Sequence, residues 1–214
     1  MCEYVGKKGL KEPKKVFLNW ITSVQKEIKK EYGIHFCYNL TGSGKRNMVI
    51  KQCNRNYFDL DYQLTITHFP EDMDYKKMAK EIKGYFRCAL DGFRPNGFTY
   101  CEDSTQALTS KNNSKHFGFD IVIVYRDNDK CYILYNQKND NNANNNDYSW
   151  QERRKMKNQW ENLAKICGVE MWEYLRENYR EKRHEHKDDV GLKKRKSFQI
   201  LNESVNETLK YFNK

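Results

Sequence analysis

A run of alternating apolar and polar residues between Tyr57 and Thr67 is the feature that most constrains the fold of this chain. A period of two predicts a β-strand with one buried face. The polar set includes Asp59 and Asp61, which project from the same face of such a strand with Cα atoms roughly 6.5–7 Å apart. Neighbouring carboxylates repel one another unless a cation lies between them. The strand therefore predicts a divalent-cation site, since Mg²⁺ prefers carboxylate oxygens.

A third acid lies in a second apolar run. Asp120 is the one charged residue in the segment 117–125, which is apolar enough to be a central strand. A carboxylate in such a strand needs a partner. We expect Asp120 to join Asp59 and Asp61 on neighbouring strands. Three acids so placed can hold two metal ions about 3.5–4 Å apart, the arrangement used for in-line phosphoryl transfer.

A short glycine-rich segment precedes the paired acids. Thr41-Gly42-Ser43-Gly44-Lys45 follows a predicted strand at 34–40 and is expected to be a loop. Glycine lets the backbone approach a phosphate closely, and a serine hydroxyl can donate to a phosphate oxygen. Gly42, Ser43 and Lys45 are therefore candidate nucleotide-binding residues. The segment is not a Walker motif, because the Gly-x-x-x-x-Gly-Lys-Ser/Thr spacing is absent.

The remaining periodicities predict an α+β fold with a mixed sheet. In chain order the further elements are helices at 14–32 and 72–90, strands near 98–109, 117–125 and 131–137, and helices at 148–166, 169–187 and 197–212. We expect a catalytic core over residues 1–138, with the first two helices flanking the sheet. An Asn-rich flexible loop at 139–147 and a helical C-terminal part at 148–214, packed as a small bundle, complete the domain organisation.

The composition limits the partners and the compartment. A net charge of +10 suits a polyanion such as a nucleotide or a nucleic acid, although the lysine runs at 7–15 and 193–196 have solvated surface as their alternative explanation. No stretch approaches the roughly 20 apolar residues of a membrane helix, and the N-terminus lacks the layout of a signal peptide. Seven cysteines without a Cys-x-x-Cys pair argue against a disulfide framework. We therefore expect a cytoplasmic protein with reduced thiols.

Taken together, three segments resemble the polymerase-β-type nucleotidyltransferase superfamily, which includes CCA-adding enzymes, oligoadenylate synthetases and cyclic GMP-AMP synthase-like proteins. The segments are Leu40–Lys45, Tyr57–Asp61 and Gly118–Val122. The resemblance covers roughly residues 14–137 and is closest to the oligoadenylate synthetase and cyclic GMP-AMP synthase-like branch. The predicted helical end is shorter than in the full-size synthases.

The resemblance implies a metal-dependent transferase that binds ATP or another nucleoside triphosphate. Asp59 and Asp61 would bind both metal ions, Mg²⁺ or Mn²⁺, and Asp120 one of them, while Gly42 and Ser43 would hold the triphosphate. The reaction would transfer a nucleotide to an acceptor hydroxyl with release of pyrophosphate. The residues do not identify the acceptor: RNA and a second nucleotide are the candidates named by the resemblance, and a protein side chain or a small molecule remains open.

Three alternatives remain open from the residues alone. A salt bridge to an arginine such as Arg87 or Arg94 is the alternative explanation of Asp120. A metal-dependent nuclease would use Asp120 with Asn136-x-Lys138, although it leaves the paired acids unexplained. A non-catalytic nucleic-acid-binding protein on the same fold would retain the basic surface, although it has no need of three adjacent carboxylates.

Overall fold

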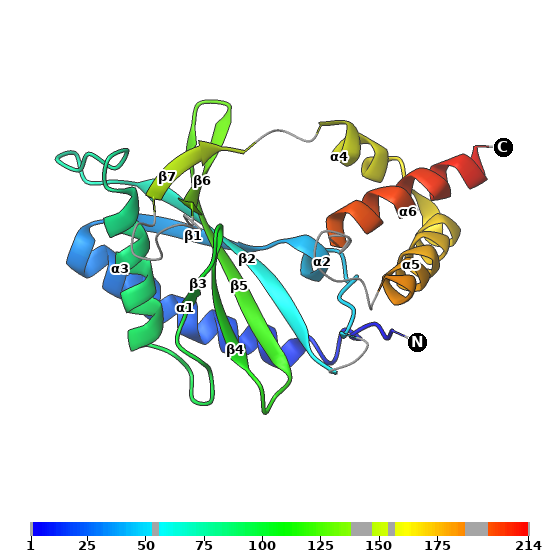
Figure 1. Cartoon of the computed structure of the whole chain (residues 1–214), viewed down its shortest axis with the longest axis horizontal. Coiled ribbons are helices and arrows are strands. Elements are labelled where there is room, and N and C mark those ends of the chain that lie inside the picture. The colour runs from blue at the N-terminus through cyan, green and yellow to red at the C-terminus, as the bar shows by residue number, and fades with distance from the viewer. Residues whose placement is uncertain (1, 53–55, 138–146, 154–156, 187–196, 214) are drawn as a thin grey trace. The chain divides into compact units, whose positions relative to one another are not determined.

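The computed structural model describes residues 2–52, 56–137, 147–153, 157–186 and 197–213 (Figure 1). The chain forms two compact units. The sheet unit comprises residues 6–49 and 57–153, and the helical unit comprises residues 1–5, 50–56 and 154–214. Nearly all of the predicted Asn-rich loop, residues 139–146, lies outside the described residues.

One mixed sheet of seven strands forms the sheet unit. The strands are β1 (His35–Leu40), β2 (Phe58–His68), β3 (Glu102–Asp103), β4 (Ala107–Asn112), β5 (Phe117–Asp127), β6 (Lys130–Gln137) and β7 (Asp147–Glu152). β2 and β5 run parallel at the centre, and every other pair is antiparallel. The second edge of β5 pairs with β4 along its first half and with β6 along its last residues. This sheet, with its helices, confirms the predicted α+β fold.

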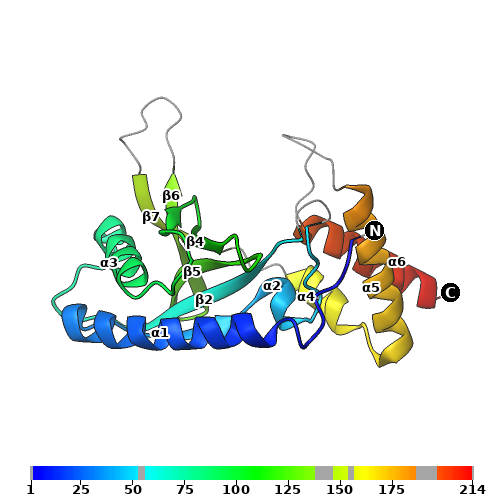
Figure 2. The same ribbon diagram turned by 90° about the horizontal axis from the view of Figure 1, so that it is seen from below.

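Helix α1 (Lys11–Tyr32) decides which face of the sheet carries the acids. It runs along one face of the sheet (Figure 2), where Phe17 stacks on Tyr62 of β2 and meets the edge of Phe119 of β5. Side chains alternate between the two faces along a strand. Because Tyr62 and Phe119 are buried against α1, Asp61 and Asp120 project from the opposite face.

Helix α3 (Ala79–Gly92) begins later than the predicted helix at 72–90, because tertiary contacts hold the preceding residues in turns. Phe69 stacks on Tyr75, and both rings pack against Tyr125. The Trp150 indole N–H donates to the Tyr75 carbonyl oxygen at 2.9 Å. That carbonyl therefore has a partner outside any helix, which removes one of the bonds that would extend α3 toward the N-terminus.

The segment from Tyr148 is also a correction. The predicted helix at 148–166 is instead strand β7 followed by helix α4 (Lys157–Ala164). β7 pairs antiparallel with β6, with Tyr148 opposite Asn136. The aromatic residues that suggested a helical face are compatible with a strand, so the sheet edge offered by β6 decided the outcome.

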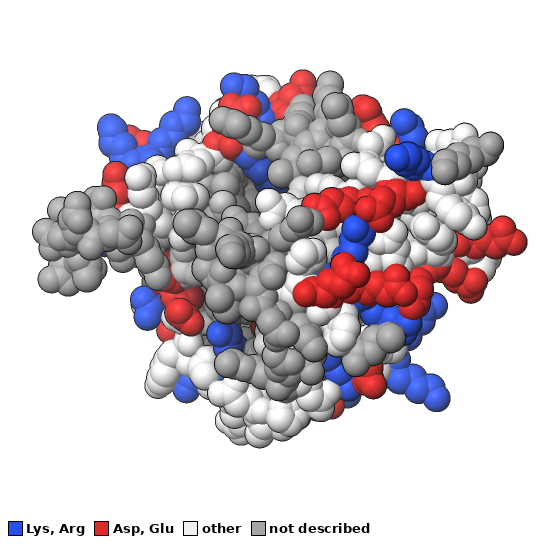
Figure 3. Space-filling view, turned by 45° about the vertical axis from the view of Figure 1, so that its right-hand side comes forward, with Lys and Arg blue, Asp and Glu red and all other residues white. Residues whose placement is uncertain are grey.

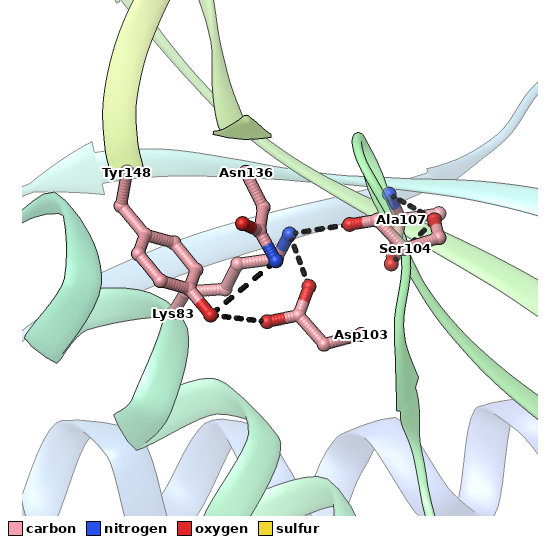
Figure 4. Close-up of polar contacts among 6 residues, drawn as sticks. All are labelled: Lys83, Asp103, Ser104, Ala107, Asn136 and Tyr148. Carbon is pink, nitrogen blue, oxygen red and sulfur yellow. Dashed lines mark hydrogen bonds and ion pairs between the residues drawn. The ribbon is translucent and has the colours of Figure 1, made fainter. Parts of the chain in front are cut away.

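A buried polar network joins α3, β3, β6 and β7 (Figure 4). Lys83 Nζ lies 2.6 Å from Asp103 Oδ1 and donates to the Ser104 carbonyl oxygen at 3.0 Å. The Tyr148 hydroxyl donates to Asp103 Oδ2 at 2.8 Å, and Asn136 Nδ2 donates to the Tyr148 hydroxyl at 3.3 Å. Lys83 is only 2% exposed, so this network fixes the strand pair β6–β7 against α3.

The helical unit contains α4, α5 (Gly168–Glu185) and α6 (Ser197–Phe212). α5 and α6 pack against each other, with Glu207 accepting from Asn178 and pairing with Lys182. The N-terminal residues join this unit through the Tyr4 hydroxyl, which donates to the Arg176 carbonyl oxygen at 2.6 Å. None of the described helices is long and apolar enough to cross a membrane.

The prediction of reduced thiols is wrong for one of the described cysteines. Cys2 is disulfide-bonded. The free cysteines among the described residues are Cys37, Cys88, Cys101, Cys131 and Cys167.

Candidate active site

The parallel pairing of β2 with β5 brings the three predicted acids together. Asp61 is the direct register partner of Asp120, and Asp59 lies opposite Gly118. Neighbouring strands lie roughly 4.7–4.9 Å apart, and alternate residues on one strand roughly 6.5–7 Å apart. The three carboxylates therefore project from one small area of the sheet, on the face opposite α1.

Burial and neighbouring carboxylates raise the pKa of two acids in this area, Asp61 and Asp59. Burial, followed by the charges of Asp120 and Asp59, raises the pKa of Asp61 from 3.8 to about 6. Burial and the charge of Asp120 also raise the pKa of Asp59, while the Tyr57 hydroxyl and the Lys111 ammonium act in the opposite direction. A cation among these carboxylates would relieve the repulsion.

Asp120 is held by a hydroxyl rather than by a salt bridge. The Thr109 hydroxyl, on the residue opposite it in β4, donates to Asp120 Oδ1 at 2.6 Å. Arg87 pairs with Asp91 instead. No ion pair among the described residues includes either Asp120 or Arg94, so the salt-bridge explanation of Asp120 is wrong.

Two glycines make room for the paired acids. A Cβ on Gly42 would overlap Asp61 Oδ2 and lie 2.9 Å from Asp61 Cγ, and the Gly42 φ of 55° is itself unfavourable for other residues. A Cβ on Gly118 would overlap the Tyr57 hydroxyl and lie 2.8 Å from Asp59 Oδ1. Each acid of β2 therefore lies over a glycine of a neighbouring segment.

The predicted glycine-rich loop is a single helical turn, α2 (Gly42–Lys45), placed beside the acids. The Thr41 N–H and hydroxyl both donate to the Asp61 carbonyl oxygen, at 2.8 and 3.1 Å. The candidate phosphate-binding residues Gly42 and Ser43 thus follow directly on a residue bonded to the backbone of Asp61.

Basic and polar groups flank the same face. The Arg46 guanidinium donates to the Gly42 carbonyl oxygen at 2.8 Å, and Lys45, the third predicted nucleotide-binding residue, is exposed at the end of α2. Gln63 follows Asp61 on the same face of β2, and Arg153 donates to its Oε1 at 3.2 Å. Cationic groups therefore lie on and directly after α2 and beside Gln63, two residues along β2 from Asp61.

The residues fit a divalent cation by their chemistry. Asp59 Oδ1 is buried and has no well-formed hydrogen bond among the described residues, and carboxylate oxygens are the donors that Mg²⁺ and Mn²⁺ prefer. As the described side chains stand, no three acidic, histidine or cysteine groups converge enough to hold a metal ion. Asp61 lies over Gly42 and Asp120 is bonded to Thr109, so these carboxylates would have to turn toward one another on metal binding.

Three residues at the site escaped the sequence prediction, namely Tyr57, Thr109 and Gly118. The Thr109 hydroxyl meets Asp120 across the β4–β5 pair, which no local pattern reveals. Tyr57 lies two residues before Asp59 and therefore on the same face, which the alternation along the chain could have indicated. Gly118 did leave a signal, because a glycine inside an apolar strand often marks a close approach by another group.

A hollow of about 400 Å³ lies elsewhere on the sheet unit. Ile66 and Tyr125, at the far ends of β2 and β5 from the acids, line it together with Phe69 and Tyr75. The hollow is therefore separate from the candidate site.

Comparison with solved structures identifies the fold. The crystal structure of Vibrio cholerae DncV cyclic AMP-GMP synthase, a prokaryotic cGAS homolog, matches with a TM-score of 0.65 and 12% identity, over 96% of this chain and 68% of that chain. The STING-associated CdnE c-di-GMP synthase from Capnocytophaga granulosa matches with a TM-score of 0.63 and 16% identity, over 98% and 63%. The GTP-bound form of Vibrio cholerae DncV matches with a TM-score of 0.59 and 13% identity, over 95% and 52%.

At the level of sequence, no family model matches the chain, and no curated protein matches it. The chain spans about half to two thirds of the length of the structures that it matches. The structural matches nevertheless cover almost the whole chain and agree with one another. The fold of this protein is therefore the one that DncV and CdnE share.

Proposed function

We propose that this protein is a metal-dependent nucleotidyltransferase that transfers a nucleotide from a nucleoside triphosphate to an acceptor hydroxyl, releasing pyrophosphate. The observation that carries the proposal is the register of Asp61 with Asp120, with Asp59 one step along the same face. Three adjacent carboxylates repel one another and destabilise the fold. Such a cost is typically retained where function requires it. The likeness to DncV and CdnE supports the same reading.

In the proposed reaction the side chains act by binding and orientation. Asp59, Asp61 and Asp120 would hold two Mg²⁺ or Mn²⁺ ions, which neutralise charge developing on the transferred phosphoryl group. Thr109 restrains Asp120 through a hydrogen bond. Asp120 is the carboxylate that we assign to accept the proton of the attacking hydroxyl, because it stands at the edge of the acidic group nearest β4.

The triphosphate is assigned to α2 and the residues around it. Gly42 has no side chain to block a phosphate, and the Ser43 hydroxyl and the α2 backbone can donate to its oxygens. Lys45 is exposed and adds a positive charge. The bond from Thr41 to the Asp61 carbonyl oxygen keeps this turn next to the acids, so a triphosphate on α2 has its reacting phosphate near the carboxylates.

A second nucleotide is the acceptor that we propose. DncV and CdnE are synthases of cyclic dinucleotides by their descriptions. The competing acceptor, RNA, calls for a continuous basic track. On the face drawn in Figure 3, acidic and basic side chains of the described residues are interspersed, and the run at 193–196 lies outside the described residues. Net charge alone therefore does not favour RNA.

Two assignments follow from this proposal. Residues 1–138, the predicted catalytic core, hold all the proposed site residues, and the sheet unit also includes strand β7 from the predicted C-terminal part. The compartment is the cytoplasm, where nucleoside triphosphates and Mg²⁺ are both available.

Product analysis tests the proposal. The chain is incubated with each labelled nucleoside triphosphate, singly and in pairs, with Mg²⁺ or Mn²⁺, and the products are separated. We expect pyrophosphate together with a linear or cyclic dinucleotide, and no product from an Asp59→Asn/Asp61→Asn variant. Cleavage of added DNA or RNA by the parent chain, without pyrophosphate, would instead support the nuclease. Nucleic-acid binding with no turnover would support the non-catalytic alternative.

A further inference from the structure

The Tyr57 hydroxyl is a buried polar group that the fold does not need. Tyr57 is only 8% exposed, and neither its hydroxyl oxygen nor Asp59 Oδ1 has a well-formed hydrogen bond to a described residue. The two groups do interact with each other, at an angle or distance short of good hydrogen-bond geometry. Phenylalanine would fill the same space without a buried hydroxyl. Stability alone therefore does not explain a tyrosine at this position.

The absence of a side chain at Gly118 leaves space for the same two groups. A Cβ at this position would overlap the Tyr57 hydroxyl, lie 2.8 Å from Asp59 Oδ1 and lie 3.0 Å from the Ser110 carbonyl oxygen. Gly118 is not among the residues with positive φ, so its backbone conformation is open to any residue. Glycine is required here for space, and the space is occupied by the Tyr57 hydroxyl and the Asp59 carboxylate.

We propose that Tyr57 is a positioning residue for Asp59, whose Oδ1 it holds over Gly118 in the orientation that binds a divalent cation. The inference rests on the proposed function and names a residue that supports its metal site. Ligating carboxylates are usually fixed by an outer hydrogen bond, and removal of such a bond weakens metal binding. A bond from a phenol to a charged carboxylate is also stronger than one between neutral groups. If a cation drew the Asp59 carboxylate toward it, the Tyr57 hydroxyl would donate to a lone pair of that carboxylate that the cation does not use.

The test is the affinity of the full chain for Mn²⁺ without nucleotide, measured by electron paramagnetic resonance and by calorimetry. Tyr57→Phe removes only the hydroxyl and is expected to weaken Mn²⁺ binding about 10-fold. A cooperative thermal melt in EDTA verifies that the variant is folded, so that a loss of Mn²⁺ affinity is not a loss of structure. The matched control is Tyr62→Phe, on the same strand but on the opposite face against Phe17. It should leave Mn²⁺ affinity unchanged.

A second variant and a double variant make the test independent of one substitution. Gly118→Ala should displace the hydroxyl and the carboxylate together, and so weaken Mn²⁺ binding by a comparable factor. In an Asp59→Asn background, Tyr57→Phe should have no further effect on Mn²⁺ affinity, because the group that it positions is gone.

The outcomes separate this inference from the proposed function. A Tyr57→Phe variant with parental Mn²⁺ affinity overturns the inference, and so does one that loses only stability, since that is the mark of a structural role. If the parent binds Mn²⁺ and the variant binds it weakly, the positioning role holds whether or not nucleotide transfer is detected. A parent that binds no Mn²⁺ refutes the metal site and the inference with it.

Discussion

Asp61 and Asp120 face each other across the parallel strands β2 and β5, in direct register. Neither strand carries the site alone. The residues between them in sequence form α3, β3 and β4 and return the chain so that the second strand lies parallel to the first. Asp120, which is distant in sequence from Asp59 and Asp61, thereby becomes their neighbour, and the predictions below follow from that proximity.

The first prediction concerns pH and Asp61. Its pKa in the folded chain is about 6, above the ordinary value of 3.8. Between these values the folded state binds more protons than the unfolded state, so the stability of the metal-free chain falls as pH rises through this window. Asp61→Asn removes the charge. It should raise stability in EDTA at pH 7 by about 1–2 kcal/mol and abolish transfer.

Thermal melts in EDTA between pH 4 and pH 7 provide the measurement. The parent should lose stability with rising pH more steeply than the Asp61→Asn variant does. Parallel curves for the two proteins, or a variant less stable than the parent at pH 7, would contradict the prediction.

The second prediction concerns the space over Gly42. In Gly42→Ala the added Cβ overlaps the Asp61 carboxylate, and the φ of 55° strains any other residue. We expect a loss of about 1–3 kcal/mol in the free energy of unfolding and a loss of transfer activity, measured by urea denaturation and product analysis. Gly84→Ala, inside α3 and with nothing within 4 Å of the new Cβ, is the matched control. It should gain up to about 1 kcal/mol.

Ser43 provides the third prediction. If its hydroxyl donates to a charged phosphate oxygen, Ser43→Ala should weaken triphosphate binding by about 1–3 kcal/mol. Calorimetric titration with a non-hydrolysable triphosphate measures the change, and Ser23→Ala on α1 is the control. Unchanged affinity would remove Ser43 from the site and leave the carboxylates unaffected.

The fourth prediction concerns the buried pair of Lys83 and Asp103, whose charged atoms are 2.6 Å apart. Lys83→Met leaves Asp103 buried without its cation and should lower the free energy of unfolding by about 3–5 kcal/mol. The double variant Lys83→Met/Asp103→Leu should recover much of that loss, because no isolated charge remains. A double variant as unstable as the sum of the two single variants would show that the pair is not coupled.

The last prediction concerns the acceptor. With a second nucleotide as the acceptor, RNA should bind weakly and with a shallow dependence on salt. A track that contacts several phosphates would instead give a log–log slope of roughly −0.7 per phosphate on a single strand. Filter binding between about 50 and 200 mM salt distinguishes the two cases. Tight binding of RNA with a steep dependence on salt would contradict this prediction and support RNA as the acceptor.

The sequence by itself determined the elements whose pattern is local. The alternation around Asp59 and Asp61 identified β2, and the apolar stripe that includes Phe17 identified α1. The same alternation determined that the two acids share a face, because the period of a strand is fixed by its backbone. The order of the three segments was sufficient to identify the fold.

Tertiary structure decided what depends on partners distant in sequence. The residues around Tyr75 are held in turns by Trp150, and the segment from Tyr148 becomes a strand because β6 offers it an edge. Likewise, the Thr109 hydroxyl meets Asp120 only because β4 pairs in one particular register with β5. Periodicity reports which face of an element is buried, whereas register, which no single segment encodes, fixes which side chains meet.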